Sequence, residues 1–241
     1  MYRLGIDLGG TNIVAGLVDE EYKIVAKASC KTNVPRPESS ICDSMAEVAL
    51  KACEKAGVSI DEVESVGIGV PGAVNPKTGI IEYSANLHFH NWEVVKMMQE
   101  RLNKKVLIEN DANAAALGEY LAGSAKGAKN AVAITLGTEV GGGIIINGKI
   151  YSGSNFAGEE LGDMVIVKDG KECGCGRKRC WEAYSSATGL INLTTEKILS
   201  DKMDYSYILK LADGDINKVN VKTAFDAAAA GDNDAQQVLD T

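Results

Sequence analysis

The sequence is poor in aromatic residues, lacks a long apolar run and has no excess of positive charge. Aromatic residues make up 5% of 241 positions, and the formal net charge is −8. Nucleic acids and anionic membrane surfaces attract basic proteins, so neither is expected as a partner. No stretch approaches the ~20 apolar residues of a membrane span, and Met1-Tyr2-Arg3 leads into an apolar segment without a signal-peptide core. We therefore expect a cytoplasmic protein that acts on a small molecule.

Cysteine is also sparse, and half of the six cysteines lie in one short segment. Cys173, Cys175 and Cys180 form a C-x-C-x4-C pattern with glycine between the thiols. In a chain expected to stay reduced, this spacing indicates a metal site and not disulfides, and glycine lets such a loop fold around a tetrahedral centre. Zinc normally takes a fourth ligand. The candidates are Asp163, Glu160 and Glu159 upstream, with His88 and His90 left open.

Short apolar segments separated by glycine-rich turns make up most of the chain, and their order predicts an α/β fold. The expected strands are 4–8, 13–18, 23–29, 66–70, 106–108, 130–136 and 144–146. The expected helices are 38–56 (closed by Gly57), 93–102, an alanine-rich helix after Asp111, and 221–239, interrupted near Gly231. Residues 73–91 read as a loop. The strand–glycine turn–strand pattern occurs from residue 4 and again from residue 131, which indicates an internal duplication.

Two glycine-rich turns, D-L-G-G-T-N at 7–12 and L-G-T-E-V-G-G-G at 136–143, have the composition of phosphate-binding turns. Glycine lets backbone N–H groups converge on phosphate oxygens, and the hydroxyls of Thr11 and Thr138 add donors. Asp7 suits magnesium held through water. Neither turn is a P-loop, because no Gly-Lys-Ser/Thr follows. Taken singly, each is more simply a hairpin turn, and the pair together favours a nucleotide site.

The segment Val106–Glu119 reads as a buried strand that runs into Asn110, Asp111 and a helix. A lone Asn-Asp pair before a helix usually supplies the N-cap. The flanking glycine turns favour a second role for Asp111, because a carboxylate at a strand-to-helix junction is a typical general base. Elsewhere, Asn86, Glu160 and Glu182 suit a ligand with several hydroxyl groups, although without further context they are more simply solvated loop residues.

Six motifs in order resemble those of the ROK family of sugar kinases and sugar-responsive repressors, over essentially the whole chain. They are G-I-D-L-G-G-T-N at 5–12, G-V-P-G at 69–72, E-N-D-A-N-A-A-A-L-G-E at 109–119, L-G-T-E-V-G-G-G-I at 136–144, E-E-L-G-D-M at 159–164 and C-G-C-G-R-K-R-C-W-E at 173–182. The nearest branch is that of the bacterial glucokinases. The resemblance implies the duplicated actin-like/hexokinase (ribonuclease H-like) fold, with lobes at 1–119 and 120–241 and a cleft between them.

The resemblance also implies roles for individual residues. Asp111 is expected to be the base that takes the proton from the attacking sugar hydroxyl. The expected sugar ligands are Gly72, Asn86, Asn110, Asp111, Glu160 and Glu182. The residues expected to face ATP phosphates and Mg²⁺ are Asp7, Gly9, Gly10, Thr11, Asn12, Gly137 and Thr138. A structural Zn²⁺ is expected on Cys173, Cys175 and Cys180, with Asp163 as a possible fourth ligand.

Three residues depart from the family pattern. Asp163 stands where G-H-M usually supplies a zinc-binding histidine, and we expect the more acidic centre to alter preference at the sugar's anomeric end. Glu139 replaces the more usual glycine of the second turn, and we expect its carboxylate to point away from phosphates. Arg179, and not glycine, precedes Cys180.

The expected activity is ATP-dependent phosphorylation of a hexose, above all glucose to glucose 6-phosphate. The alternatives are a kinase for fructose, allose or N-acetylmannosamine, or a sugar-sensing protein without catalysis. A repressor is disfavoured because no helix-turn-helix domain precedes the first strand. Family members usually continue past the helix at 221–239 into a glycine-rich segment that closes the adenosine pocket. We therefore expect that this chain is truncated and that it binds ATP weakly or is inactive. A homodimer is expected.

Overall fold

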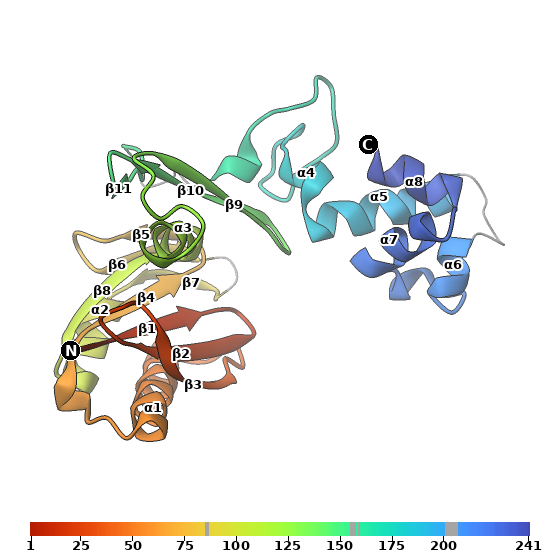
Figure 1. Cartoon of the computed structure of the whole chain (residues 1–241). Coiled ribbons are helices and arrows are strands. Elements are labelled where there is room, and N and C mark those ends of the chain that lie inside the picture. The colour runs from red at the N-terminus through yellow and green to blue at the C-terminus, as the bar shows by residue number, and fades with distance from the viewer. Residues whose placement is uncertain (85–86, 155–157, 159, 201–206) are drawn as a thin grey trace. The chain divides into compact units, whose positions relative to one another are not determined.

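The computed structural model describes residues 1–84, 87–154, 158, 160–200 and 207–241. The chain divides into two compact units, drawn with their elements in Figure 1. The first comprises Met1–Ala133 with Gly143–Glu159, and the second comprises Ile134–Gly142 with Glu160–Thr241. The lobe boundary at 119/120 stays a prediction.

A five-stranded sheet forms the centre of the first unit, in the order β3-β2-β1-β4-β8. Its strands are β1 (Tyr2–Leu8), β2 (Asn12–Val18), β3 (Ile24–Lys31), β4 (Val63–Val70) and β8 (Lys105–Asn110). Strands β1, β4 and β8 are parallel, and β2 runs antiparallel to both of its neighbours. These strands match the segments expected from sequence, with ends that differ by one to three residues. The carboxyl ends of β1, β4 and β8 therefore meet at one edge.

Helices cover both faces of this sheet. Helix α1 (Glu38–Ala56) and helix α2 (Val94–Leu102) pack together, while α3 (Asp111–Ala122) contacts β4 and β8. Figure 1 shows α1 and α3 on opposite sides of the sheet. The predicted helix 38–56 is confirmed, and it ends at Gly57 in the left-handed region (φ 68°), where the N–H of this residue bonds the last carbonyls.

The loop predicted for residues 73–91 is wrong in part, because this segment forms a second, antiparallel sheet. Its strands are β5 (Ala73–Asn75), β6 (Ile80–Ser84) and β7 (Phe89–Trp92), in the order β5-β6-β7. The strands are three to five residues long and carry polar residues such as His90 and Asn91. Such short mixed segments lack the alternation that identifies a strand. Ile81 and Trp92 anchor the sheet in the main core.

A third sheet, in the order β11-β10-β9, follows the first unit's helices. Its strands are β9 (Ala131–Leu136), β10 (Val140–Ile146) and β11 (Lys149–Ile150). The predicted glycine turn 137–143 is too long, because Gly141, Gly142 and Gly143 lie within β10. A Cβ at Gly142 would collide with the Leu161 side chain, and one at Gly143 with Ala116. These two glycines therefore permit close packing, and the turn itself is limited to 137–139.

Beyond residue 181, the described part of the second unit is mainly helical, whereas residues 164–181 form a loop with the isolated β-bridges Val165–Cys180 and Glu172–Lys178. Its helices are α4 (Glu182–Ser185), α5 (Ala187–Ser200), α6 (Tyr207–Leu211), α7 (Val221–Ala229) and α8 (Asn233–Leu239), and short 3₁₀ turns occur at Ile60–Glu62, Leu161–Asp163 and Ile216–Lys218. The predicted interruption of the last helix near Gly231 is confirmed. A small apolar core joins α5 to α8. Among the helices that the structure describes, none is both long enough and apolar enough to span a membrane.

Candidate active site and thiol cluster

The parallel strands of the first unit bring predicted site residues to one edge. Asp7 on β1 lies beside Gly69 on β4, which in turn lies beside Glu109 on β8. Gly69 has no side chain, and a Cβ there would lie 3.6 Å from the Cα of Asp111. The missing side chain leaves room for the first turn of α3 over the end of β4. Residues far apart in sequence, Asp7 and Asp111, thus belong to the same edge.

Asn110, and not Asp111, caps helix α3. The Asn110 Oδ1 accepts the N–H of Ala112 at 2.8 Å and the N–H of Asn113 at 3.2 Å. Asp111 is the first helical residue, and its Oδ1 accepts the neighbouring Ala112 N–H at 2.9 Å. Because Asn110 satisfies the free amides at the helix start, the Asp111 carboxylate is not needed there.

Both residues, Asp7 and Asp111, are solvent-accessible, but neighbouring protein atoms partly desolvate their carboxyl groups and shift the protonation of both. The pKa of Asp111 is raised by burial, against hydrogen bonds from backbone N–H groups that lower it. The pKa of Asp7 is raised by burial first and by the negative charge of Asp111 second. Desolvation and like charge both disfavour the ionised form. A divalent cation at this edge would remove that repulsion, and carboxylate oxygens are suitable ligands for Mg²⁺.

Gly72 connects the β4 end to the same edge. Asn110 Nδ2 donates to the Gly72 carbonyl at 3.2 Å. Gly72 has a φ of 106°, and a Cβ there would collide with the main-chain oxygen of Tyr83. Glycine is therefore required at this position. Asn86, a predicted sugar ligand, lies outside the described residues.

The first glycine turn is closed by a hydrogen bond from Gly9 N–H to the Asn12 carbonyl at 3.0 Å. Thr32, which sequence reasoning missed, holds this turn from the end of β3. Its hydroxyl donates to the Gly9 carbonyl at 2.6 Å, and its N–H donates to the Thr11 carbonyl at 2.9 Å. Thr32 is fully buried, whereas Thr11 and Asn12 are exposed. Thr32 thus fixes the main chain of the turn on its buried side. The exposed side, with Thr11 and Asn12, is accessible to a ligand.

The second glycine turn is held in a similar way within the second unit. Gly137 N–H donates to the Glu139 carbonyl at 3.0 Å, which closes the turn. The start of α5 then binds its carbonyls: Ala187 N–H donates to Gly137 at 2.8 Å, and the Thr188 hydroxyl donates to Thr138 at 2.9 Å. In a trans peptide the next N–H points opposite to the carbonyl. The N–H groups of Thr138 and Glu139 therefore point away from α5.

The three clustered thiols and Asp163 meet in the second unit. One ligand atom from each of Asp163, Cys173, Cys175 and Cys180 lies within 4.8 Å of the others. The Sγ atoms of Cys175 and Cys180 are 3.6 Å apart. Zn–S bonds of about 2.3 Å in a tetrahedron place sulfur atoms ~3.8 Å apart, so this separation fits zinc. Among the residues that the structure describes, this group contains neither His88 nor His90, the two histidines left open as the fourth zinc ligand.

The thiols of this cluster differ in acidity. Burial raises the pKa of the Cys173 and Cys180 thiols. Burial acts in the same direction at Cys175, but hydrogen bonds from the backbone and side chain of Arg177 outweigh it, so that the Cys175 pKa is lowered. A metal that binds thiolates must therefore displace protons at neutral pH, and its affinity increases with pH.

Glu182 joins the thiol cluster to β10. Its Oε2 accepts the Val140 N–H at 3.3 Å, and its Oε1 accepts the Cys173 thiol at 3.7 Å. Glu160 immediately precedes the 3₁₀ turn that carries Asp163. Both predicted sugar-binding glutamates of the second unit therefore lie in segments that also support the thiol cluster. Arg179, in the same loop, has a φ of 79°, a region that favours the glycine expected there.

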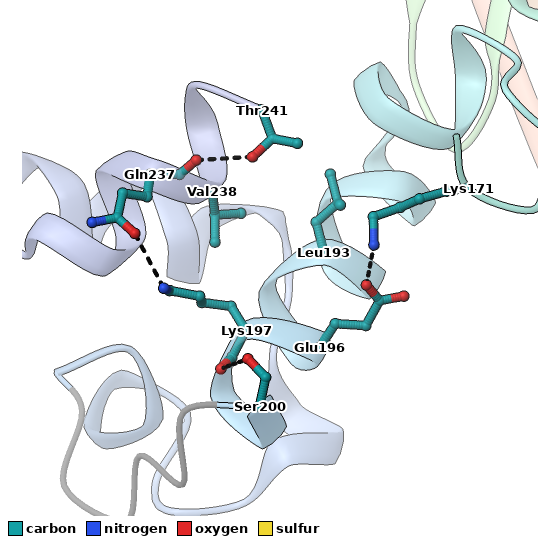
Figure 2. A pocket seen from close by; sticks show the side chains of 8 residues that line it. All are labelled: Lys171, Leu193, Glu196, Lys197, Ser200, Gln237, Val238 and Thr241. Carbon is teal, nitrogen blue, oxygen red and sulfur yellow. Dashed lines mark hydrogen bonds and ion pairs between the residues drawn. The ribbon is translucent and has the colours of Figure 1, made fainter. Parts of the chain in front are cut away.

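A pocket of about 360 Å³ in the second unit contains none of the predicted site residues. Figure 2 shows its lining side chains, which come mainly from α5 and α8. Both of its lysines are paired: Lys171 Nζ with Glu196 in the lining, and Lys197 Nζ with Asp234 Oδ1 at 3.6 Å, besides a hydrogen bond that Lys197 donates to the neutral Gln237 Oε1 at 3.1 Å. This pocket therefore offers no unpaired charge to a phosphate and is not the candidate active site.

Comparison with known proteins identifies the family. A glucokinase of Thermotoga maritima is 37% identical over 238 residues, which cover 98% of this chain and 73% of that protein. The crystal structure of a ROK family glucokinase from Streptomyces griseus with glucose and AMPPNP matches with a TM-score of 0.78 at 35% identity, over 99% of this chain and 74% of that chain. The ROK hexokinase structure from Thermus thermophilus matches with a TM-score of 0.80 at 29% identity, over 99% and 72%.

These similarities confirm the predicted actin-like/hexokinase fold. The sequence model of the ROK family matches residues 3–241, and the chain therefore belongs to the ROK family.

Proposed function

We propose that this protein is an ATP- and magnesium-dependent hexose kinase that phosphorylates glucose at its 6-hydroxyl. The observation that carries the proposal is the position of Asp111: a solvent-accessible carboxylate at the end of a parallel strand, which is not needed for the helix cap that Asn110 supplies and whose charge raises the pKa of Asp7. The similarity to glucokinases, one of them solved with glucose and an ATP analogue, supports glucose as the sugar.

In the proposed reaction, Asp111 accepts the proton of the sugar hydroxyl as its oxygen bonds to the γ-phosphorus and the bond to ADP breaks. The raised pKa of Asp111 makes it a better proton acceptor than an ordinary aspartate. The catalytic groups chiefly position the reactants and neutralise charge, as phosphoryl transfer requires. Mg²⁺, when bound, would offset negative charge on the phosphates, and Asp7 is the residue proposed to hold it through water.

The sugar is proposed to contact Gly72, Asn86, Asn110, Asp111, Glu160 and Glu182. Asn110 illustrates how one side chain serves two tasks. Its Oδ1 caps α3, and one Nδ2 hydrogen bonds Gly72, which leaves the second Nδ2 hydrogen for a sugar hydroxyl. The ATP phosphates are proposed to bind to the exposed sides of the two glycine turns. The residues proposed for this role are Gly9, Gly10, Thr11, Asn12, Gly137 and Thr138. A C₂ homodimer stays a prediction.

A structural zinc is proposed on Cys173, Cys175, Cys180 and Asp163. The distances among their ligand atoms fit a tetrahedral centre, and three thiolates are typical of closed structural sites. Such a centre would fix Glu182 at the start of α4, since the Cys173 thiol is in contact with this carboxylate. The role proposed for the metal is to shape the sugar-binding segment.

The function is tested by a coupled ADP-release assay with Mg-ATP and a hexose panel of glucose, fructose, allose and N-acetylmannosamine. Glucose is expected to give the highest kcat/KM. The control is the Asp111→Asn variant, which should bind glucose in calorimetry but turn over about 10²–10⁴-fold more slowly. ADP release equal in wild type and variant would show that Asp111 is not the base. Preference for another panel member would keep the chemistry and replace glucose as the substrate.

A further inference from the structure

Three consecutive basic residues in the thiol loop each pair with a different acidic residue. Lys178 Nζ lies 3.0 Å from Glu172 Oε1, and Arg179 Nη2 lies 3.2 Å from Asp169 Oδ1. Arg177 Nη2 lies 2.7 Å from Asp163 Oδ2. Of these three acids, Asp163 is the one whose carboxylate also lies within ligand distance of the clustered thiols. The Arg177 pair therefore differs in kind from its two neighbours.

Arg177 holds Asp163 at two points. Besides the ion pair, its Nη2 donates to the main-chain carbonyl of Asp163 at 3.2 Å. The ion pair uses one carboxylate oxygen, Oδ2, and a carboxylate that binds zinc through one atom needs only the other. A guanidinium has a rigid planar fork that fixes the orientation of the group it contacts. Arg177 thus restrains both the backbone and the carboxylate of this candidate ligand.

Arg177 also affects the formal charge of the metal centre. Three thiolates and one carboxylate carry four negative charges, so Zn²⁺ leaves a formal charge of −2 on the centre. A neutral imidazole in place of the carboxylate leaves −1. One guanidinium at 2.7 Å from the carboxylate restores the same total of −1. The pair of Asp163 and Arg177 is therefore equivalent in charge to one neutral ligand.

We propose that Arg177 is a positioning residue of the metal centre, which orients Asp163 as the fourth ligand and compensates its charge. This inference rests on the proposed zinc site. Residues that hydrogen bond to a metal ligand set its direction and tune the affinity of the site. The matched neighbour Lys178 lies in the same loop but pairs with an acid outside the cluster, so it provides the control.

The test measures zinc content and zinc affinity by competition with a colorimetric chelator. Arg177→Met is expected to lower the affinity for zinc by about 10–100-fold, the usual effect of removing a partner of a metal ligand. Lys178→Met is expected to change it by less than about threefold, as for an exposed ion pair. Arg177→Lys should give an intermediate loss, because the charge is kept and the fork is lost.

The Asp163→His background separates charge compensation from loop folding. With a neutral ligand at 163 there is no carboxylate to orient or compensate, so adding Arg177→Met is expected to lower zinc affinity by a smaller factor than in the wild-type background, and the remaining loss reports the hydrogen bond of Arg177 to Cys175. An equal loss in both backgrounds would reduce Arg177 to a loop-folding role and overturn the inference. Unchanged affinity in Arg177→Met alone would also overturn it. Absence of zinc from the wild-type protein would remove the zinc site itself, a distinct failure.

Discussion

Two adjacent side chains, Asn110 and Asp111, divide the work at the junction of β8 and α3. Asn110 satisfies the first amides of the helix, and Asp111 stands in the first turn with a raised pKa caused by burial. Sequence reasoning left open which of the two capped the helix. Hydrogen bonds decide it, because only Asn110 reaches the N–H of both Ala112 and Asn113.

The first prediction concerns Asp111 alone. Asp111→Asn is expected to lower kcat by about 10²–10⁴, because proton transfer to a positioned base supplies a factor of this size. The glucose dissociation constant should change by less than about threefold, since the amide keeps its hydrogen-bond geometry. The coupled assay measures the first value and calorimetry the second. Glu109→Gln, one residue earlier on β8, is the matched control, and a kcat within tenfold of wild type in Asp111→Asn would contradict the assignment.

At the scale of elements, each glycine turn is fixed from behind by a threonine of another segment. The second prediction is that Thr32→Val destabilises the protein by about 1–2 kcal/mol, because a buried hydroxyl that donates to Gly9 is lost at nearly constant shape. The KM for ATP should rise more than the KM for glucose. Urea unfolding and steady-state kinetics measure the two effects. Thr32→Ser retains the donor, and an ATP KM raised equally in both variants would count against the hydrogen bond.

The third prediction concerns the start of α5. Thr188→Val removes the donor to the Thr138 carbonyl and frees the peptide that follows it. Because that carbonyl orients the Glu139 N–H away from α5, we expect a higher KM for ATP and an unchanged dissociation constant for glucose. Stability should change by less than about 1 kcal/mol, since this bond is exposed. Thr188→Ser should behave as wild type. Weaker glucose binding in Thr188→Val would show that the turn serves the sugar instead.

At the scale of the whole molecule, the two carboxyls at the sheet edge make stability depend on pH. The folded-state pKa values of Asp7 and Asp111 are raised above their ordinary value of 3.8. Groups with raised folded-state pKa values contribute full stability below the unfolded-state pKa, and this contribution is lost as pH rises through the folded-state pKa. The fourth prediction is that Asp111→Asn melts at a higher temperature than wild type at pH 7, and that the difference shrinks towards pH 3.8. Melting curves of both proteins between pH 3.8 and pH 7 measure this difference in melting temperature. A difference that does not change with pH would exclude titration of Asp111 as its cause.

Sequence patterns predicted the elements whose apolar spacing is regular and whose ends carry specific residues. Helix α1, with Gly57 after it, was placed at both ends, whereas the position of Asp7 and Asp111 at one edge follows from the parallel strand pairing that the structure shows. The sheet β5–β7 was missed because its strands are short and are stabilised by pairing across the chain, which local spacing does not reveal. Thr32 and Thr188 were missed for another reason: a single threonine carries no signal until the fold brings a glycine turn to its hydroxyl.

The separate cap at Asn110 also has an evolutionary consequence. In the genetic code a single nucleotide change converts an aspartate codon to an asparagine codon. One such change at position 111 would therefore remove the proposed general base. Because helix α3 is capped by Asn110, the change to asparagine leaves the helix start intact and removes a negative charge that disfavours ionisation of Asp7. A lineage could therefore exchange catalysis for ligand sensing without passing through an unfolded ancestor. The division of tasks between two neighbouring residues leaves the fold free to survive the loss of its chemistry.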